Sequence, residues 1–157
     1  MKTEFRKARL PHDLRALMTF DRIIFSPSDC FTAADWRRYT TFWMLIDGVK
    51  AGCCAFQEHV DFAEDRGAVN PKRKRSLYIT TTGIHPKYQG KGFGQLLKSW
   101  EVAYAMHHGF TRIVTNTRRN NSRMIVLNKQ FGFRRLRTTP GYYDDPPDAT
   151  VVMELLL

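Results

Sequence analysis

The fold is decided by the stretch Tyr88-Gln89-Gly90-Lys91-Gly92-Phe93-Gly94-Gln95-Leu96-Leu97. Before it, residues 76–84 are rich in β-branched and aromatic side chains, which predicts a β-strand. After it, residues 95–108 show helical spacing of apolar side chains. The expected inward face of that helix is Leu96, Leu97, Trp100, Ala103 and Tyr104, with His107 as a further candidate. A glycine-rich turn into a helix N-terminus offers unpaired N–H groups to an anion, so the stretch predicts a phosphate-binding loop.

The spacing of the glycines narrows the choice of phosphate ligand. The pattern Gln89-x-x-Gly92-x-Gly94 differs from the three-glycine dinucleotide fingerprint, and no Gly-Lys-Ser/Thr follows as in a Walker loop. It resembles the Gln/Arg-x-x-Gly-x-Gly/Ala pyrophosphate loop of the GNAT acetyltransferase superfamily. The resemblance implies that acetyl-CoA binds here, through Gly83, Ile84, Gln89, Gly90, Lys91, Gly92, Phe93 and Gly94. A glycine-rich turn before an ordinary surface helix is the alternative interpretation.

Residues 120–133 (NNSRMIVLNKQFGF) resemble the second signature of the same superfamily. Asn121 can cap the helix that begins there, and its amide can also meet an amide of the cofactor. The resemblance adds Asn128 to the cofactor contacts, because many members place at this position the tyrosine that protonates the leaving thiolate. An asparagine can donate a hydrogen bond but cannot give up a proton. Water, Tyr142 or Tyr143 would then have to supply the proton.

The predicted elements follow one another as β-α-α-β-β-β-α-β-α-β-β, with no internal repeat and no linker. Expected strands cover residues 5–9, 40–46, 49–59, 76–84, 111–117, 133–139 and 150–157, and expected helices cover 12–25, a short segment from 32, 95–108 and 121–130. This is an α/β chain with a mixed, mostly antiparallel central sheet flanked by helices. The order is that of the GNAT fold, which implies a single acetyltransferase domain over residues 1–157.

Composition sets the remaining bounds. The 157 residues are 43% hydrophobic and carry a net charge of +10, which indicates one packed domain that attracts anions. No apolar run is long enough to span a bilayer, and the N-terminus lacks the core of a signal peptide, so we expect a cytoplasmic protein. The three cysteines form no metal-ligand pattern, so no metal is expected. The basic clusters at 72–75 and at Arg134, Arg135 and Arg137 indicate solvated surface or nonspecific attraction of nucleic acid; a homodimer is left open.

Acetyl transfer needs a neutral amine, a donor to the oxyanion and a proton for the leaving thiolate. By resemblance, the backbone N–H of Ile84 is the donor to the acetyl carbonyl. Many members place a catalytic glutamate where this chain has Tyr78, and others place one where it has Asn116. Tyr78 is therefore the candidate base, although a strand tyrosine packed in the sheet is the alternative. Without a carboxylate base, an α-amine with a pKa of about 8 suits the enzyme better than a lysine near 10.4.

Two further stretches resemble the acceptor side of protein N-terminal acetyltransferases of the ribosomal-protein alanine type. Phe25 and Pro27 resemble a Phe-Pro substrate loop, and Tyr142 with Tyr143 resembles a hairpin whose tyrosines hold the acceptor backbone. Tyr143 is also a catalytic candidate. Glu58, His59, Asp61 and Glu64 could instead bind an acceptor cation, with a solvated loop as the alternative. The acceptor is thus an amine, either a peptide N-terminus or a small amine such as a polyamine or aminoglycoside, and a weakly active acyl-CoA-binding module is the alternative from another class.

Overall fold

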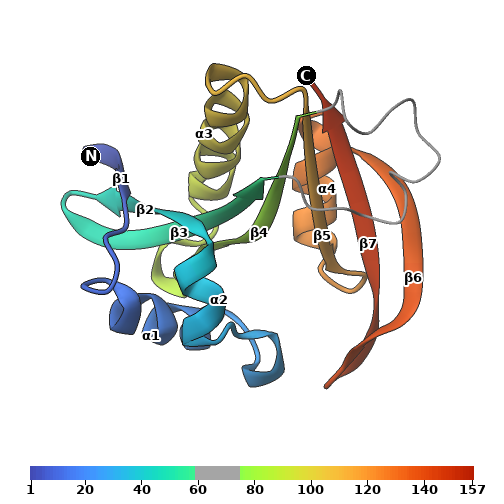
Figure 1. Ribbon diagram of the computed structural model, residues 1–157, viewed down its shortest axis with the longest axis horizontal. Helices are drawn as coiled ribbons and strands as arrows, with labels where there is room; N and C mark the ends of the chain where they lie inside the picture. The colour runs from blue at the N-terminus through green and yellow to red at the C-terminus, as the bar shows by residue number, and fades with distance from the viewer. Residues whose placement is uncertain (59–74) are drawn as a thin grey trace. The chain divides into compact units, whose positions relative to one another are not determined.

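The computed structural model of the chain describes residues 1–58 and 75–157. Its strands are β1 (Thr3–Lys7), β2 (Thr40–Ile46), β3 (Val49–Glu58), β4 (Ser76–Ile84), β5 (Arg112–Arg118), β6 (Arg134–Asp144) and β7 (Pro147–Leu156). Its helices are α1 (Leu14–Ile24), α2 (Ala33–Arg38), α3 (Phe93–His107) and α4 (Ser122–Gln130), with 3-10 turns η1 (Pro27–Asp29) and η4 (Pro86–Tyr88). Figure 1 shows these elements in the predicted order.

Hydrogen-bonded neighbours in the sheet follow the order β1-β2-β3-β4-β5-β7-β6. The pairs β1–β2, β2–β3, β5–β7 and β6–β7 are antiparallel, while β4–β5 is parallel. The prediction of a mixed, mostly antiparallel sheet is therefore confirmed. By its internal contacts the chain divides into two compact units, residues 1–57 with 80–97 and residues 58–79 with 98–157.

The first unit has a core between two helices and two strands. Buried apolar side chains from α1, α2, β2 and β3 form it, namely Leu17, Phe20, Trp36, Trp43, Leu45, Cys53 and Ala55. Neighbouring residues set the ends of these elements. Thr32 and Asp35 form a reciprocal capping box at the start of α2, which satisfies two otherwise unpaired donors. Asp47 and Gly48 take left-handed backbone angles in the turn between β2 and β3.

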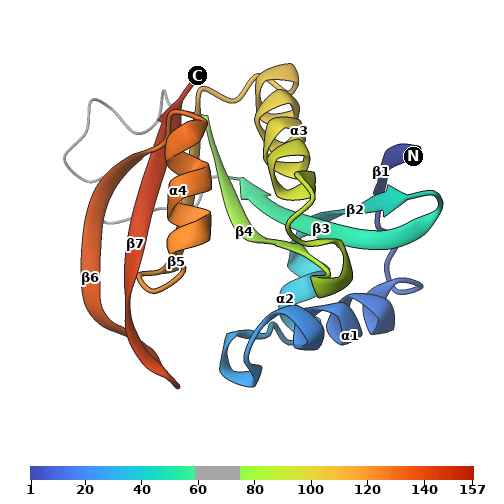
Figure 2. The same cartoon turned by 180° about the vertical axis from the view of Figure 1, so that it is seen from behind.

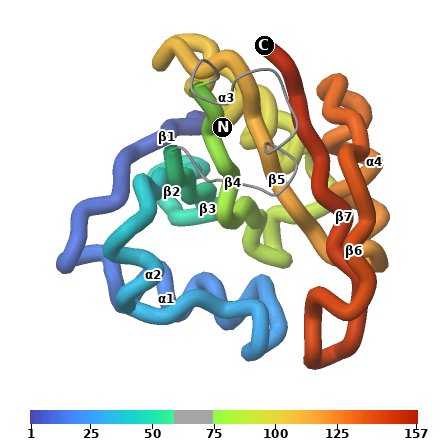
Figure 3. Tube along the Cα trace, turned by 45° about the vertical axis from the view of Figure 1, so that its right-hand side comes forward, coloured from blue at the N-terminus to red at the C-terminus, as the bar shows by residue number. Residues whose placement is uncertain are grey.

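The second unit ends in the long hairpin of β6 and β7, which Figure 3 shows running together over most of its length. The expected strands stop at residue 139 and resume at residue 150, which is too short because pairing continues to Asp144↔Pro147. Pro140 and Gly141, which indicate a loop, lie where the register shifts between Thr139 and Tyr143. An edge strand tolerates proline and glycine at such a bulge, because the lost ladder bonds face away from the sheet.

The inward face of α3 also differs from the prediction. Phe93, Leu97, Lys98, Glu101 and Ala105 are buried. Of the expected inward residues, Leu96, Ala103 and His107 are exposed. The reason is an ion pair of Lys98 with Glu101, 2.7 Å apart, with both side chains almost fully buried. Hydrophobic spacing assigns charged residues to solvent, so it predicts the wrong buried face for this helix.

Helix α4 lies along β7 in the second unit (Figure 2). The apolar side chains of Met124, Ile125 and Leu127 are half-buried, while the one buried residue of the helix is Asn128. Within the described residues, no helix is both long and apolar enough to cross a bilayer.

Candidate active site

The glycine loop is held in shape by its own residues. The Gln89 side-chain nitrogen donates to the Ile84 carbonyl oxygen at 2.8 Å, and this bond ties the start of the loop to the end of β4. The backbone N–H of His85 donates to the Ala51 carbonyl on β3, also at 2.8 Å. Gln89 therefore shapes the loop through its side chain. The sequence motif alone does not say whether this glutamine holds the loop or contacts the ligand.

The loop meets the requirements of a phosphate cradle. Gly90 and Gly92 have φ angles of 75° and 85°, and a Cβ added to either would contact no atom within 4 Å. The left-handed backbone explains why both are glycine, and the open space lets a ligand approach the main chain. The loop leads directly into the first turn of α3, whose N–H groups have no partner within the helix. Lys91 is exposed in the same loop, and its positive charge suits a diphosphate.

Gly83, on the loop-bearing strand β4, lies close to the candidate acceptor segment, residues 25–31, within the first unit. A Cβ at Gly83 would lie 2.9 Å from the Ile24 side chain and 3.7 Å from the Phe25 ring. Phe25, at the end of α1, therefore lies against Gly83, which directly precedes Ile84. Phe25 itself is half-buried, while Pro27 is exposed at the first position of η1.

Gly52 on β3 belongs to the same packing and is absent from the sequence-based prediction. A Cβ there would lie 2.9 Å from the Ile84 side chain and 3.0 Å from the Gly83 carbonyl oxygen. An isolated glycine inside a strand pattern is a signal for such close approach, and it could have been used.

Tyr78 lies in a hydrogen-bonded cluster of the second unit. Its hydroxyl donates to Oδ1 of Asn116, and Nδ2 of Asn116 donates to the Thr150 hydroxyl at 3.0 Å and to the Tyr143 hydroxyl at 3.5 Å. Thr150 in turn donates to the Thr117 carbonyl at 3.3 Å. Two tyrosines that the sequence assigns to different parts of the site thus share one amide. The cluster side chains carry no carboxylate.

The hairpin tyrosines have different environments. Tyr142 is 56% exposed, and its ring meets the Tyr143 ring edge-on with centroids 4.9 Å apart. The Arg118 guanidinium lies 4.2 Å from the Tyr143 ring and donates to the carbonyls of Pro146 and Asp145 at 2.6 and 3.1 Å. Arg118 fixes Tyr143 relative to the hairpin turn, and nothing in the sequence pattern pointed to it. Tyr142 remains available to a ligand on the surface.

The two asparagines of the second motif are also used differently. Asn121 is exposed and caps α4, where its Oδ1 accepts from the Met124 N–H at 3.3 Å. The side chain of Asn128 is fully buried, and its Nδ2 lies 3.8 Å from the Met153 sulfur. Its Oδ1 finds no hydrogen-bond partner in the part of the chain that is described. A buried acceptor left unpaired is costly, so this oxygen fits an added donor such as a ligand amide.

Two buried carboxylates, one in each unit, have shifted pKa values. Burial raises the pKa of the Asp21 carboxyl to about 6, although a hydrogen bond from the Phe31 N–H opposes that rise. Burial would likewise raise the pKa of Glu154, but hydrogen bonds from Arg134 and Arg112 outweigh it and hold that pKa below its ordinary value. Glu154 is therefore an ionised structural anchor of β7. Neither carboxylate was a sequence-based candidate.

Of residues 58–64, which could bind an acceptor cation, and of the basic cluster at 72–75, the structure describes only Glu58 and Arg75. Glu58 is about half exposed, and its carboxylate lies 3.3 Å from the Arg75 guanidinium, which favours a role at the surface. His59, Asp61 and Glu64, together with Lys72, Arg73 and Lys74, lie outside the described residues. Arg134 of the second basic cluster pairs with Glu154 at 2.6 Å.

A family comparison covers most of the chain. The model of the acetyltransferase (GNAT) family matches residues 12–133. The probable N-acetyltransferase san of Drosophila melanogaster is 26% identical over 156 residues, which cover 93% of this chain and 77% of the fly protein.

Solved structures share the fold at low sequence identity. The ribosomal-protein-S18-alanine N-acetyltransferase of Escherichia coli has a TM-score of 0.80 and 17% identity, covering 99% of this chain and 94% of the bacterial one. Arabidopsis thaliana Naa50, solved with the bisubstrate analogue CoA-Ac-MVNAL, has a TM-score of 0.82 and 18% identity over 100% of both chains. The predicted resemblance, including that to N-terminal acetyltransferases, is confirmed at the level of the fold.

Proposed function

Because this chain belongs to the GNAT family of acetyltransferases, we propose that it transfers the acetyl group of acetyl-CoA to the α-amine of a peptide or protein N-terminus. The acetyl carbon leaves the CoA sulfur and bonds to the amine nitrogen. The amine loses a proton in this exchange, and the CoA thiolate gains one. The residues of the site can be assigned to these needs from their positions.

The observation that carries the proposal is the sharing of Asn116 by Tyr78 and Tyr143. It supports a site where the tyrosine of the loop-bearing strand and the tyrosine of the hairpin act on the same acceptor. Such a cluster offers hydroxyl groups and rings, which suit a peptide backbone and its terminal amine. It offers no negative charge to hold a polycation, so polyamines and aminoglycosides fit it less well.

The pKa of the acceptor amine also favours a peptide N-terminus. A phenol with a pKa near 10 is a weak base at neutral pH, so the enzyme gains most from an amine that is already partly neutral. An α-amine with a pKa of about 8 is roughly one-tenth neutral at pH 7, whereas a lysine amine near 10.4 is neutral in fewer than one molecule in a thousand. Tyr78 donates its proton to Asn116, and a phenol takes up a proton from the amine or from a bridging water only once it has released its own.

The cofactor end of the site rests on the glycine loop. We assign the diphosphate of acetyl-CoA to the main chain of residues 89–94, where the glycines leave open space. The thioester supplied by acetyl-CoA is the activated acyl group of the reaction. Asn121 and the unpaired Oδ1 of Asn128 suit the amide groups of the cofactor's pantetheine arm.

Tyr78 and Ile84 are too far apart along β4 to act on the same carbonyl group. Ile84 follows Tyr78 by six residues, which at about 3.3 Å per residue is roughly 20 Å of extended strand. One carbonyl cannot meet both residues, so with Tyr78 acting at the acetyl group we do not retain the Ile84 N–H as its oxyanion donor. The protonation of the leaving thiolate falls to water or to Tyr143, since Asn128 has no proton to release.

The test is release of free CoA thiol from acetyl-CoA in the presence of three acceptor sets: peptides with varied N-termini, polyamines and aminoglycosides. The proposal expects release with a class of peptides, and loss of release when the same peptides carry a blocked N-terminus. Release with small amines only would replace the proposed acceptor. Tight acetyl-CoA binding without release on any acceptor would favour the binding-module alternative.

A further inference from the structure

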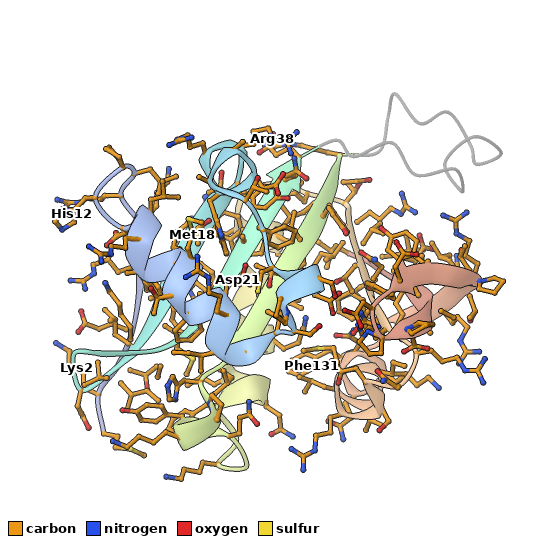
Figure 4. All side chains as sticks on the ribbon, turned by 90° about the horizontal axis from the view of Figure 1, so that it is seen from below. Lys2, His12, Met18, Asp21, Arg38 and Phe131 are labelled. Carbon is orange, nitrogen blue, oxygen red and sulfur yellow. The ribbon has the colours of Figure 1, made fainter. Side chains whose placement is uncertain are left out.

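Asp21 is a buried carboxylate that the proposed chemistry does not use. It lies in the last turn of α1 (Figure 4), and only 3% of its surface is exposed. Removing a carboxylate from water is costly unless a strong hydrogen bond replaces the lost hydration. The partner of Asp21 therefore indicates what the residue holds in place.

Asp21 binds both ends of the candidate acceptor segment, residues 25–31. Its backbone carbonyl accepts from the Phe25 N–H at 2.9 Å, and its side-chain Oδ2 accepts from the Phe31 N–H at 2.7 Å. The residues between these two bonds form a closed turn. The Asp29 N–H donates to the Ser26 carbonyl at 2.9 Å, and the Cys30 N–H donates to the Pro27 carbonyl at 3.3 Å.

The two ends are also seated against different parts of the first unit. The Phe31 ring packs edge-on against Trp36 and Tyr39, with centroids 5.6 and 5.1 Å apart. At the other end, Phe25 lies next to Gly83 on the loop-bearing strand. The side-chain bond from Asp21 spans ten residues of sequence and links these two anchors. Its loss would leave the turn free to shift relative to β4.

We propose that Asp21 is a positioning residue for the acceptor: its buried carboxylate fixes the segment 25–31 so that Phe25 and Pro27 meet the acceptor peptide. This rests on the proposed function, because it gives that segment its role in acceptor binding. Asp21 touches neither the cofactor loop nor the tyrosine cluster through any of these bonds. Its effect is therefore expected in acceptor affinity and not in acetyl-CoA affinity.

The test compares Asp21→Ala with the isosteric Asp21→Asn, whose side-chain oxygen can still accept from Phe31. Leu17→Ala is the matched control, because Leu17 lies one turn earlier on α1, is fully buried, and offers no hydrogen-bond acceptor to the Phe31 N–H. All variants are assayed at a temperature where unfolding curves show them folded. Acceptor KM, acetyl-CoA KM and kcat are measured with the best peptide.

We expect Asp21→Ala to raise the acceptor KM by about tenfold or more, with acetyl-CoA KM unchanged within about twofold. Asp21→Asn and Leu17→Ala should keep the acceptor KM near that of the wild type. An unchanged acceptor KM in Asp21→Ala, an equal rise in Leu17→Ala, or an equal rise in Asp21→Asn would each overturn the proposal.

A second readout does not depend on turnover. Amide hydrogen exchange at Phe31 should speed up by about tenfold or more in Asp21→Ala, and not in Asp21→Asn, because the bonded N–H is released. Unchanged exchange would overturn the positioning role even if activity fell. If the wild type transfers acetyl to no acceptor while exchange at Phe31 responds as expected, the proposed function fails and the structural link made by Asp21 stands.

Discussion

The hydroxyl of Tyr78 donates its hydrogen bond to the side-chain oxygen of Asn116, and the side-chain nitrogen of the same asparagine reaches Tyr143. One amide thus orients the proton of one tyrosine and supports the hydroxyl of another. This arrangement fixes the direction of the Tyr78 O–H.

Tyr78→Phe should lower kcat by about a hundredfold, the usual size of a general acid–base contribution. The ring and its packing remain, so the dissociation constant of acetyl-CoA should stay within about twofold of the wild-type value. Steady-state kinetics with the best peptide and calorimetric titration of acetyl-CoA measure the two quantities separately. Equal turnover in the variant would return Tyr78 to a packing role.

Gly92→Glu should abolish acetyl-CoA binding, because a side chain and a negative charge would enter the proposed diphosphate cradle. The substitution also strains a backbone with φ of 85°, and Gly48→Glu controls for that strain. Gly48 has a φ of 80° and equal open space, but it lies in the turn between β2 and β3. Titration should show loss of affinity in the first variant only. Retained affinity in Gly92→Glu would remove the cofactor assignment.

The buried pair of Lys98 and Glu101 predicts an asymmetry in stability. Lys98→Met leaves the Glu101 carboxylate buried without its cation and should cost about 3–5 kcal/mol of unfolding free energy. The double variant Lys98→Met with Glu101→Leu removes both charges and should recover most of that loss. Urea unfolding at neutral pH measures each value. Additive losses in the double variant would show that the two charges do not depend on each other.

The sequence predicts the elements of this fold well where local rules act alone. The helix from residue 32 and the strands at 40–46 and 49–59 are examples, since the capping box at Thr32 and the turn at Asp47-Gly48 that bound them need only neighbouring residues. Spacing failed for α3, because a buried ion pair reverses the expected polarity of two positions. Asp21 and Arg118 were missed for a related reason: their partners are ten and more than twenty residues away, and only the folded backbone brings them together.

Stability should depend on pH through Asp21. Its pKa is raised by burial from 3.8 to about 6, so between those values the folded protein holds a proton that the unfolded chain has released. The contribution of Asp21 to the unfolding free energy is therefore fully present below about pH 4, falls as the pH rises to about 6, and stays low above that. The charged and titratable groups that influence this region are Arg22, Asp29, Cys30 and Tyr39. Asp21→Asn cannot ionise, so the stability of that variant relative to wild type should rise by about 2–3 kcal/mol between pH 4 and pH 7. Urea unfolding of both proteins at each pH gives this difference, and a value independent of pH would show that the Asp21 carboxyl titrates at its ordinary pKa.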